Sequence, residues 1–88
     1  MNKDKRKLLA DMGYEDTVVF VNPSYETAIV GVSYDDRAIY DLDLMIDYLV
    51  ENDGMTEEEA LEFIDYNTVR ACNYMEGAPI IMTRLIDD

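Results

Sequence analysis

Carboxylates at regular helical spacing are the most concentrated chemical groups in this sequence. From Asp41 to Tyr66 the chain holds ten acidic residues and no lysine or arginine. Asp43, Asp47 and Glu51 recur four residues apart, which would stack them about 6 Å apart along one side of a helix with a rise of about 1.5 Å per residue. Like charges at this spacing lower the stability of a helix, so the row does not serve the helix itself.

Catalysis and metal binding are the first kinds of chemistry to test against these carboxylates. Paired carboxylates act as acid and base when one lies in an apolar pocket, but these fall on predicted solvent faces, so no catalytic residue is assigned. A calcium loop fails because, with Gly54 at its sixth position, Leu49 and Ala60 fall where carboxylates are required. The chain has no histidine and one cysteine, Cys72, which is expected to be a small core residue. No metal or cofactor is therefore expected, and a weak hydrolase is only a third hypothesis.

The net charge points to binding of a basic partner. Twenty acidic residues against seven basic ones give the 88-residue chain a net charge of −13, and four of the basic residues lie in the first seven positions. Such a field repels nucleic acid and anionic membranes, so neither is expected to bind directly, and it attracts positively charged proteins. A solvated face that keeps a small protein soluble is the alternative interpretation.

The residues predicted to bind the partner lie on two expected helices and the turn between them. Carboxylates act there as surrogates for phosphates, and an exposed tyrosine adds an aromatic contact. The predicted set is Asp43, Asp47, Glu51, Asp53, Glu58, Glu62, Asp65 and Tyr66.

Two helices are expected to position these side chains. The first spans 42–52, because its apolar residues recur with the spacing of one buried stripe, with Asp41 as N-cap and Gly54 as the stop. The second begins after Thr56, which forms a capping box with Glu59, and runs to about Tyr74 or Met75. Its expected core face is Ala60, Leu61, Ile64, Thr68, Ala71, Cys72 and Met75. Asn67, at the edge of that face, is expected to bond the backbone of a neighbouring loop.

Strands are expected at 17–21, 25–34, 38–41 and 79–86, from their β-branched and aromatic residues. The second is interpreted as a central strand, in which Gly31 marks a bulge or a close backbone approach. The resulting order is β-β-β-α-α-β. It predicts an α+β fold with a small, mostly antiparallel β-sheet and a helical hairpin packed on one face. The basic segment 1–13 is expected to be a short helix or partly disordered, and 14–88 a single compact α+β domain.

Five stretches resemble a set of short proteins encoded by low-GC Gram-positive bacteria, their prophages and mobile elements. These stretches are NPSYETAIVG, RAIYD, DGMTEEEA, IDYNTVRA and the final PII, and the likeness covers about residues 20–83. Most members of this set have no assigned activity. Small acidic phage proteins of this size include anti-CRISPR inhibitors, and several of these bind Cas9 and compete with DNA.

The function expected from charge and resemblance is inhibition without catalysis. The chain is predicted to be an acidic inhibitor that binds a basic nucleic-acid-handling protein in the host cytoplasm. The resemblance to phage-borne proteins favours an anti-CRISPR protein that blocks the CRISPR effector nuclease Cas9 by DNA mimicry. The alternative is a structural or assembly module that acts as a homodimer through apolar surface, such as a strand edge or the patch from Tyr66 to Val69.

Overall fold

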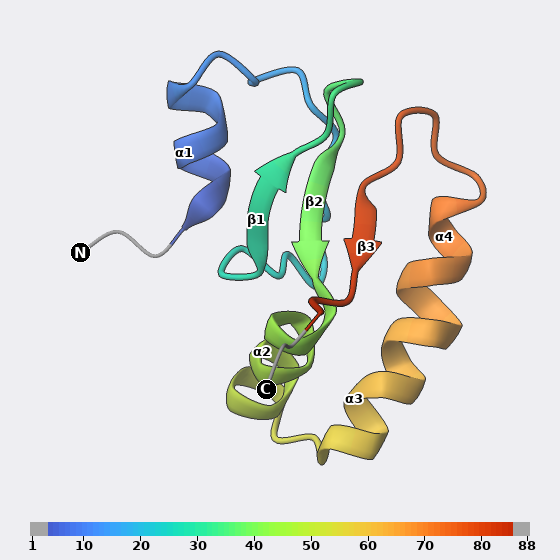
Figure 1. Cartoon of the computed structure of the whole chain (residues 1–88). Helices are drawn as coiled ribbons and strands as arrows, with labels where there is room; N and C mark the ends of the chain where they lie inside the picture. The colour runs from blue at the N-terminus through green and yellow to red at the C-terminus, as the bar shows by residue number, and fades with distance from the viewer. Residues whose placement is uncertain (1–3, 86–88) are drawn as a thin grey trace.

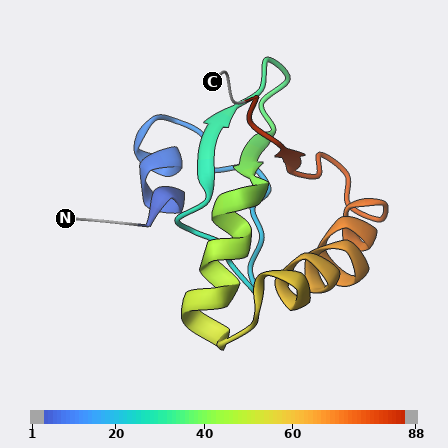
Figure 2. The same cartoon turned by 60° about the horizontal axis from the view of Figure 1, so that its bottom comes forward.

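The structure is a computed structural model that describes residues 4–85 and shows a small α+β domain with a three-stranded mixed sheet (Figure 1). Its elements, in chain order, are α1 (Lys5–Asp11), β1 (Ile29–Val32), β2 (Ala38–Asp41), α2 (Leu42–Asp53), α3 (Glu57–Phe63), the π-helical segment η1 (Ile64–Val69), α4 (Arg70–Cys72) and β3 (Ile80–Met82). Helix α1 lies beside β1, and the continuous helix α3–η1–α4 lies on the other side of the sheet, next to β3 (Figures 1 and 2).

The sheet has the order β1-β2-β3, with β2 in the centre. β1 and β2 form the predicted antiparallel hairpin, and the predicted irregularity near Gly31 is confirmed by a register shift between Ile29 and Gly31. β2 and β3 are parallel, so the prediction of a mostly antiparallel sheet is wrong for this pair. The physical reason is visible in Figure 1: α2 lies beyond the end of β2, and only α3–η1–α4 runs back along the strands, so the chain enters β3 from the same end as β2.

The predicted strand at 17–21 is not a strand in the structure, although its residues serve the core. Phe20 is buried, and its backbone N–H donates to the hydroxyl of Tyr40 at 3.0 Å. Val21 is exposed. A side chain therefore takes the place of a neighbouring strand as hydrogen-bond partner, which β-propensity alone does not reveal.

The predicted strands 25–34 and 79–86 are both shorter in the structure. Tyr25 has a φ of +49° and accepts a hydrogen bond from the N–H of Ala28 at 2.8 Å, so a turn precedes β1, which is an edge strand and not the predicted central one. β3 ends at Met82 because its partner β2 ends at Asp41 and continues as α2. The last residue of the predicted strand, Ile86, lies outside the described residues.

The boundaries of α2 and the start of α3 confirm the local signals in the sequence. The carboxylate of Asp41 caps α2 by accepting from the N–H of Leu44, and Gly54 ends the helix in the left-handed conformation at φ +68°. The side chain of Thr56 accepts from the N–H of Glu59, whose carboxylate accepts in return from the N–H of Thr56.

The second long helix differs from the prediction in its pitch. Ala60, Ile64 and Thr68 are buried at intervals of four residues, whereas Leu61 and Ala71 are exposed although they were predicted for the core. The π-helical turns of η1 contain more residues per turn than an α-helix, so positions after η1, such as Ala71, are rotated away from the predicted core face. The helix ends at Cys72 with shorter-range bonds, before the predicted end.

The core joins the sheet, the helices and the segment before β1. Tyr25, Tyr40, Met45 and Leu49 are fully buried, and the ring of Phe20 contacts those of Tyr25 and Tyr40. The hydroxyls of Tyr25 and Thr68 are 2.8 Å apart, which ties the segment before β1 to η1.

Thr68, and not Asn67, makes the side-chain contact between this helix and the segment before β1. Asn67 is exposed, and its side-chain amide donates to the carbonyl of Phe63 in its own helix at 3.2 Å. The prediction that Asn67 bonds a neighbouring loop is therefore wrong. The widened turn of η1 moves Asn67 outwards and places Thr68 on the buried side.

Candidate functional site: the acidic groove

A groove of about 330 Å³ lies between α2 and α3 and is lined by carboxylates of both helices. Ile46 from α2 and Leu61 from α3 contribute apolar surface between the charges. We call this feature the acidic groove; its lining residues are Asp43, Ile46, Asp47, Glu57, Glu58 and Leu61. None of these described lining residues is basic, so the groove combines apolar surface with charge of one sign.

Local structure fixes the two helices that form the groove. At the start of α2, Asp41 is fully buried, and the Nε atom of Arg84 lies 2.5 Å from its Oδ2 atom. Within residues 4–85 the Oδ2 atom of Asp41 has no hydrogen-bond partner. Its contact with Arg84 is therefore an ion pair without hydrogen-bond geometry. The ion pair joins the segment after β3 to the beginning of α2, and the capping box fixes the beginning of α3. The first turns of both helices contribute carboxylates to the groove.

The structure places all eight predicted partner-binding residues at exposed positions, but not on one surface. Asp43, Asp47 and Glu58 line the acidic groove. Glu62 and Tyr66 line a separate depression of about 360 Å³ with Met55, Glu59 and Phe63. The remaining three, Glu51, Asp53 and Asp65, line neither feature.

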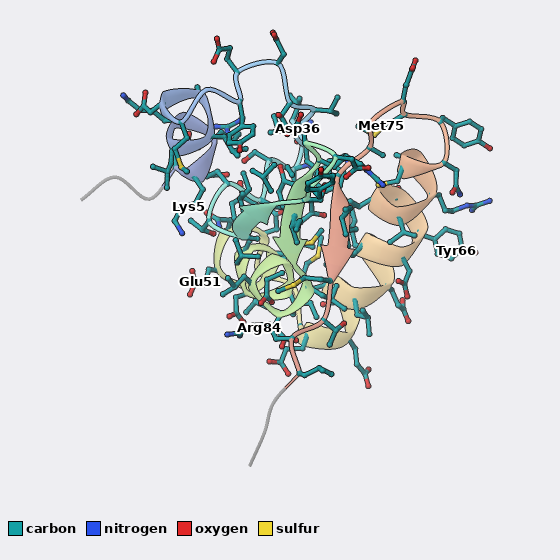
Figure 3. All side chains as sticks on the ribbon, turned by 45° about the horizontal axis from the view of Figure 1, so that its top comes forward. Lys5, Asp36, Glu51, Tyr66, Met75 and Arg84 are labelled. Carbon is teal, nitrogen blue, oxygen red and sulfur yellow. The ribbon has the colours of Figure 1, made fainter. Side chains whose placement is uncertain are left out.

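Glu51 and Tyr66 illustrate this separation. Figure 3 shows them on opposite sides of the molecule, with their side chains pointing away from each other. The predicted surface therefore divides into the acidic groove, the depression beside Tyr66, and isolated carboxylates. A single flat partner surface does not touch all eight residues at once.

Sequence reasoning missed three residues of the groove. Glu57 was interpreted only as a favourable charge at the helix start, Ile46 as part of a core stripe, and Leu61 as core. Leu61 lies in α3 before η1 and is exposed beside the buried line of Ala60 and Ile64. A four-residue repeat through Ala60, Ile64 and Thr68 was the available signal, and it places Leu61 beside the buried line.

The charges of the groove are not compensated by nearby ion pairs. Within residues 4–85 the ion pairs are Arg6–Asp4, Lys7–Asp11, Arg37–Asp35 and Arg84–Asp41, and none includes a predicted partner-binding residue. Arg70 instead lies over the ring of Tyr66, with 5.4 Å between its Cζ atom and the ring centroid. The groove therefore presents negative potential to an approaching cation.

Metal and nucleophile chemistry find little support in the described part of the chain. Within residues 4–85 no group of three or more His, Cys, Asp or Glu side chains is arranged to hold a metal ion. Burial raises the pKa of the Cys72 thiol, which favours the protonated, unreactive form. Its Sγ atom lies 4.0 Å from the carbonyl oxygen of Pro79.

The chain matches no protein-family model, no curated protein and no solved structure with which it was compared. The resemblance to short phage-borne proteins therefore stays a prediction from the sequence. Between residues 4 and 85, no helix has the length and apolar character needed to span a bilayer.

Proposed function

We propose that this protein is a non-enzymatic inhibitor that binds a basic nucleic-acid-handling protein through the acidic groove. The observation that carries the proposal is the convergence of Asp43 and Asp47 with Glu57 and Glu58 around apolar surface, without a basic residue in the lining. Carboxylates pair with arginine through two parallel hydrogen bonds, as phosphates do, so an arginine-rich channel accepts either group. Apolar surface between the charges gives such a contact an anchor that excludes water.

The target we propose is Cas9, blocked by DNA mimicry in the cytoplasm of the host cell. Cas9 reads its short DNA motif with arginines and holds the guide heteroduplex in a positively charged channel. A groove lined by four carboxylates offers these arginines a competing partner. The resemblance described from the sequence supports the same target. The groove is the proposed contact, and the carboxylates outside it, including those of the separate depression beside Tyr66, raise the association rate.

A second candidate function is assembly as a homodimer through the outer face of the sheet. Strand alternation and register place Ile39 and Ile80 next to each other on the face opposite to Tyr40 and Ile81. Ile39 and Ile80 are half-buried, and neither belongs to the set of described residues that packs against the core, whereas Ile81 does. Apolar surface of this kind favours a protein partner. In this candidate the partner is a second copy, and the apolar contact has to outweigh the repulsion between two chains with a net charge of −13.

Charge reversal in the groove tests the inhibitor. In the variant Asp43→Lys/Asp47→Lys/Glu58→Lys, we expect affinity for guide-loaded Cas9 to fall roughly 100-fold or more, because attractive contacts become repulsive. The measurement is titration calorimetry at two salt concentrations, and wild-type affinity should fall steeply as salt rises.

The matched control changes the net charge by the same amount at exposed positions away from the groove. The control variant is Glu15→Lys/Asp16→Lys/Glu76→Lys. Only a modest, salt-sensitive loss is expected from it. Equal losses in both triple variants would show that net charge alone matters and would remove the groove from the proposal. A salt-insensitive dimer without affinity for Cas9 would favour the second candidate.

A further inference from the structure

A second groove, of about 500 Å³, lies on the other side of the molecule between α1 and the edge of β1 (Figure 1). Its volume falls within the range of typical ligand sites. The lining residues are Lys5, Leu8, Leu9, Met12, Tyr14 and Ile29–Val32. Leu8 and Met12 are 51% and 65% exposed, so apolar side chains of α1 face solvent here. We call this feature the α1–β1 groove.

The strand that forms one wall of this groove has a sheet partner on one side only. β1 is an edge strand, and within residues 4–85 its residues Ile29–Val32 make no backbone hydrogen bond outside the sheet. Unpaired N–H and C=O groups along a strand edge are a template for another strand. Gly31 lies in this edge strand and lines the groove, and a Cβ atom built on it, which would point out of one face of the sheet, meets nothing within 4 Å. The face of the sheet beside Gly31 therefore has room for the side chains of an added strand.

The charge of the α1–β1 groove is opposite to that of the acidic groove. Lys5 is the one charged residue among its lining residues. The backbone N–H of Lys5 donates to the carbonyl of Glu26 at 3.0 Å, which places Lys5 near the Ile29 end of β1. Figure 3 shows its side chain at the start of α1. No ion pair within residues 4–85 includes Lys5, so its ammonium group is available to a carboxylate.

We propose that the α1–β1 groove binds an extended peptide segment of a partner protein. The segment adds a strand to β1, packs apolar side chains against Leu8 and Met12, and places a carboxylate beside Lys5. Main-chain hydrogen bonds supply affinity in this binding mode, and pockets for alternate side chains supply specificity. A second copy of the chain suits the groove less well, because two molecules with a net charge of −13 repel each other. This inference does not depend on the acidic groove.

Two synthetic peptides test the proposal. Both alternate valine and threonine over six residues and carry blocked ends; one ends in two aspartates and the other in two lysines. With the full chain labelled for NMR, we expect the aspartate peptide to shift the amide signals of Ile29–Val32 and α1, and to bind this groove about tenfold more tightly than the lysine peptide. The lysine peptide is expected to shift signals of the acidic groove instead.

Variants separate the roles of charge and apolar surface. Lys5→Glu should reverse the preference between the two peptides at β1. Leu8→Ser/Met12→Ser should weaken the aspartate peptide about tenfold, and both positions are exposed enough for the fold to remain intact. Leu61→Ser, which removes a similarly exposed leucine from the acidic groove, is the matched control and should leave this binding unchanged.

Three results would overturn the proposal. The first is that the aspartate peptide shifts no signal of Ile29–Val32. The second is that both peptides bind β1 equally in the wild type. The third is that the signals of β1 shift with protein concentration alone, which would make a second copy of the chain the occupant of the α1–β1 groove.

Discussion

The acidic groove and the α1–β1 groove offer different kinds of contact. The acidic groove lies between two helices and is lined by side chains, with carboxylates around Ile46 and Leu61. The α1–β1 groove is bounded by an edge strand, so it also offers backbone groups, with Lys5 as its one charged lining residue. A groove between helices therefore recognises the charge and shape of a partner, whereas a strand edge also recognises an extended polypeptide chain. Salt should therefore weaken binding at the first groove far more than at the second.

The largest loss of stability is expected from substitution of Tyr25, because this residue connects the segment before β1 with the helices of the acidic groove. Its side chain is fully buried, its hydroxyl contacts Thr68 of η1, and its ring lies 5.6 Å from that of Tyr48 in α2. Tyr25→Ala should lower the free energy of unfolding by about 3–5 kcal/mol and impair both grooves together. Urea denaturation measures this loss. Tyr34→Ala, at a fully exposed tyrosine, should change stability by less than about 0.5 kcal/mol, and equal losses would contradict the assignment of Tyr25 to the core.

A smaller loss of stability is expected from substitution of Arg84, and it should be largest in the helix α2 that forms one wall of the acidic groove. Arg84→Ala leaves the buried carboxylate of Asp41 without its cation and should destabilise the protein by about 1–3 kcal/mol. The loss should be below that of a fully buried pair, because the Arg84 side chain is 55% exposed. In Arg84→Ala, hydrogen exchange of the backbone amides should accelerate more in the first turn of α2 than in α1. Arg70→Ala, which removes a cation that lies over the Tyr66 ring, is the control; a loss as large as that of Arg84→Ala would argue against the ion pair.

The capping box gives a test confined to one wall of the acidic groove. Thr56→Ala removes the hydroxyl that accepts from the N–H of Glu59 and should lower the free energy of unfolding by about 1 kcal/mol. Amide exchange should increase in α3 and remain unchanged in α1 and β1. Thr83→Ala, at an exposed threonine outside the helices, should have no measurable effect. Faster exchange spread evenly over both grooves would show that the two regions do not open independently.

The smallest expected effect is a dependence of the folding stability on pH that arises from Glu26, near the α1–β1 groove. The hydroxyl of Ser24 donates to the carboxylate of Glu26 and holds the pKa of that carboxyl below its ordinary value of 4.5. A lowered folded-state pKa means that the unfolded chain takes up the proton first as pH falls. The resulting stability is present above about pH 4.5 and is lost as pH falls through the folded-state pKa.

Glu26→Gln tests this pH dependence. The variant should be less stable than the wild type at pH 7 and approach it at pH 3, as measured by thermal unfolding at a series of pH values. Glu15→Gln, at an exposed glutamate, is the control and should follow the wild-type curve. A stability difference between Glu26→Gln and the wild type that stays constant from pH 7 to pH 3 would contradict the assignment.

Local signals predicted the elements that depend on neighbouring residues. Asp41, Gly54 and the capping box at Thr56 were found from the sequence because each acts within one helical turn. The exposure of the acidic row on α2 follows from the apolar stripe that includes Met45 and Leu49. Asp43 and Asp47 of that row line the acidic groove, whereas Glu51 does not.

Long-range contacts decided the features that the sequence predictions missed. The segment 17–21 has the residues of a strand, yet the hydroxyl of Tyr40 takes the N–H of Phe20. The π-helical turns of η1 come with the contact between Thr68 and Tyr25, which are far apart in the sequence. Ala71, which follows η1, is exposed although it was predicted for the core.

The charge of this protein, the N-caps of its two long helices and the strand at 38–41 all follow from short stretches of sequence. Three features depend instead on how distant segments meet: β3 is parallel to β2, β1 has a free edge among the described residues, and the eight predicted partner-binding residues are divided among separate surfaces. The two groups of features differ in the distance along the chain over which their interactions act. Caps and hydrophobic stripes act over one or a few turns of chain, whereas strand order and shared surfaces depend on which distant segments meet when the core closes.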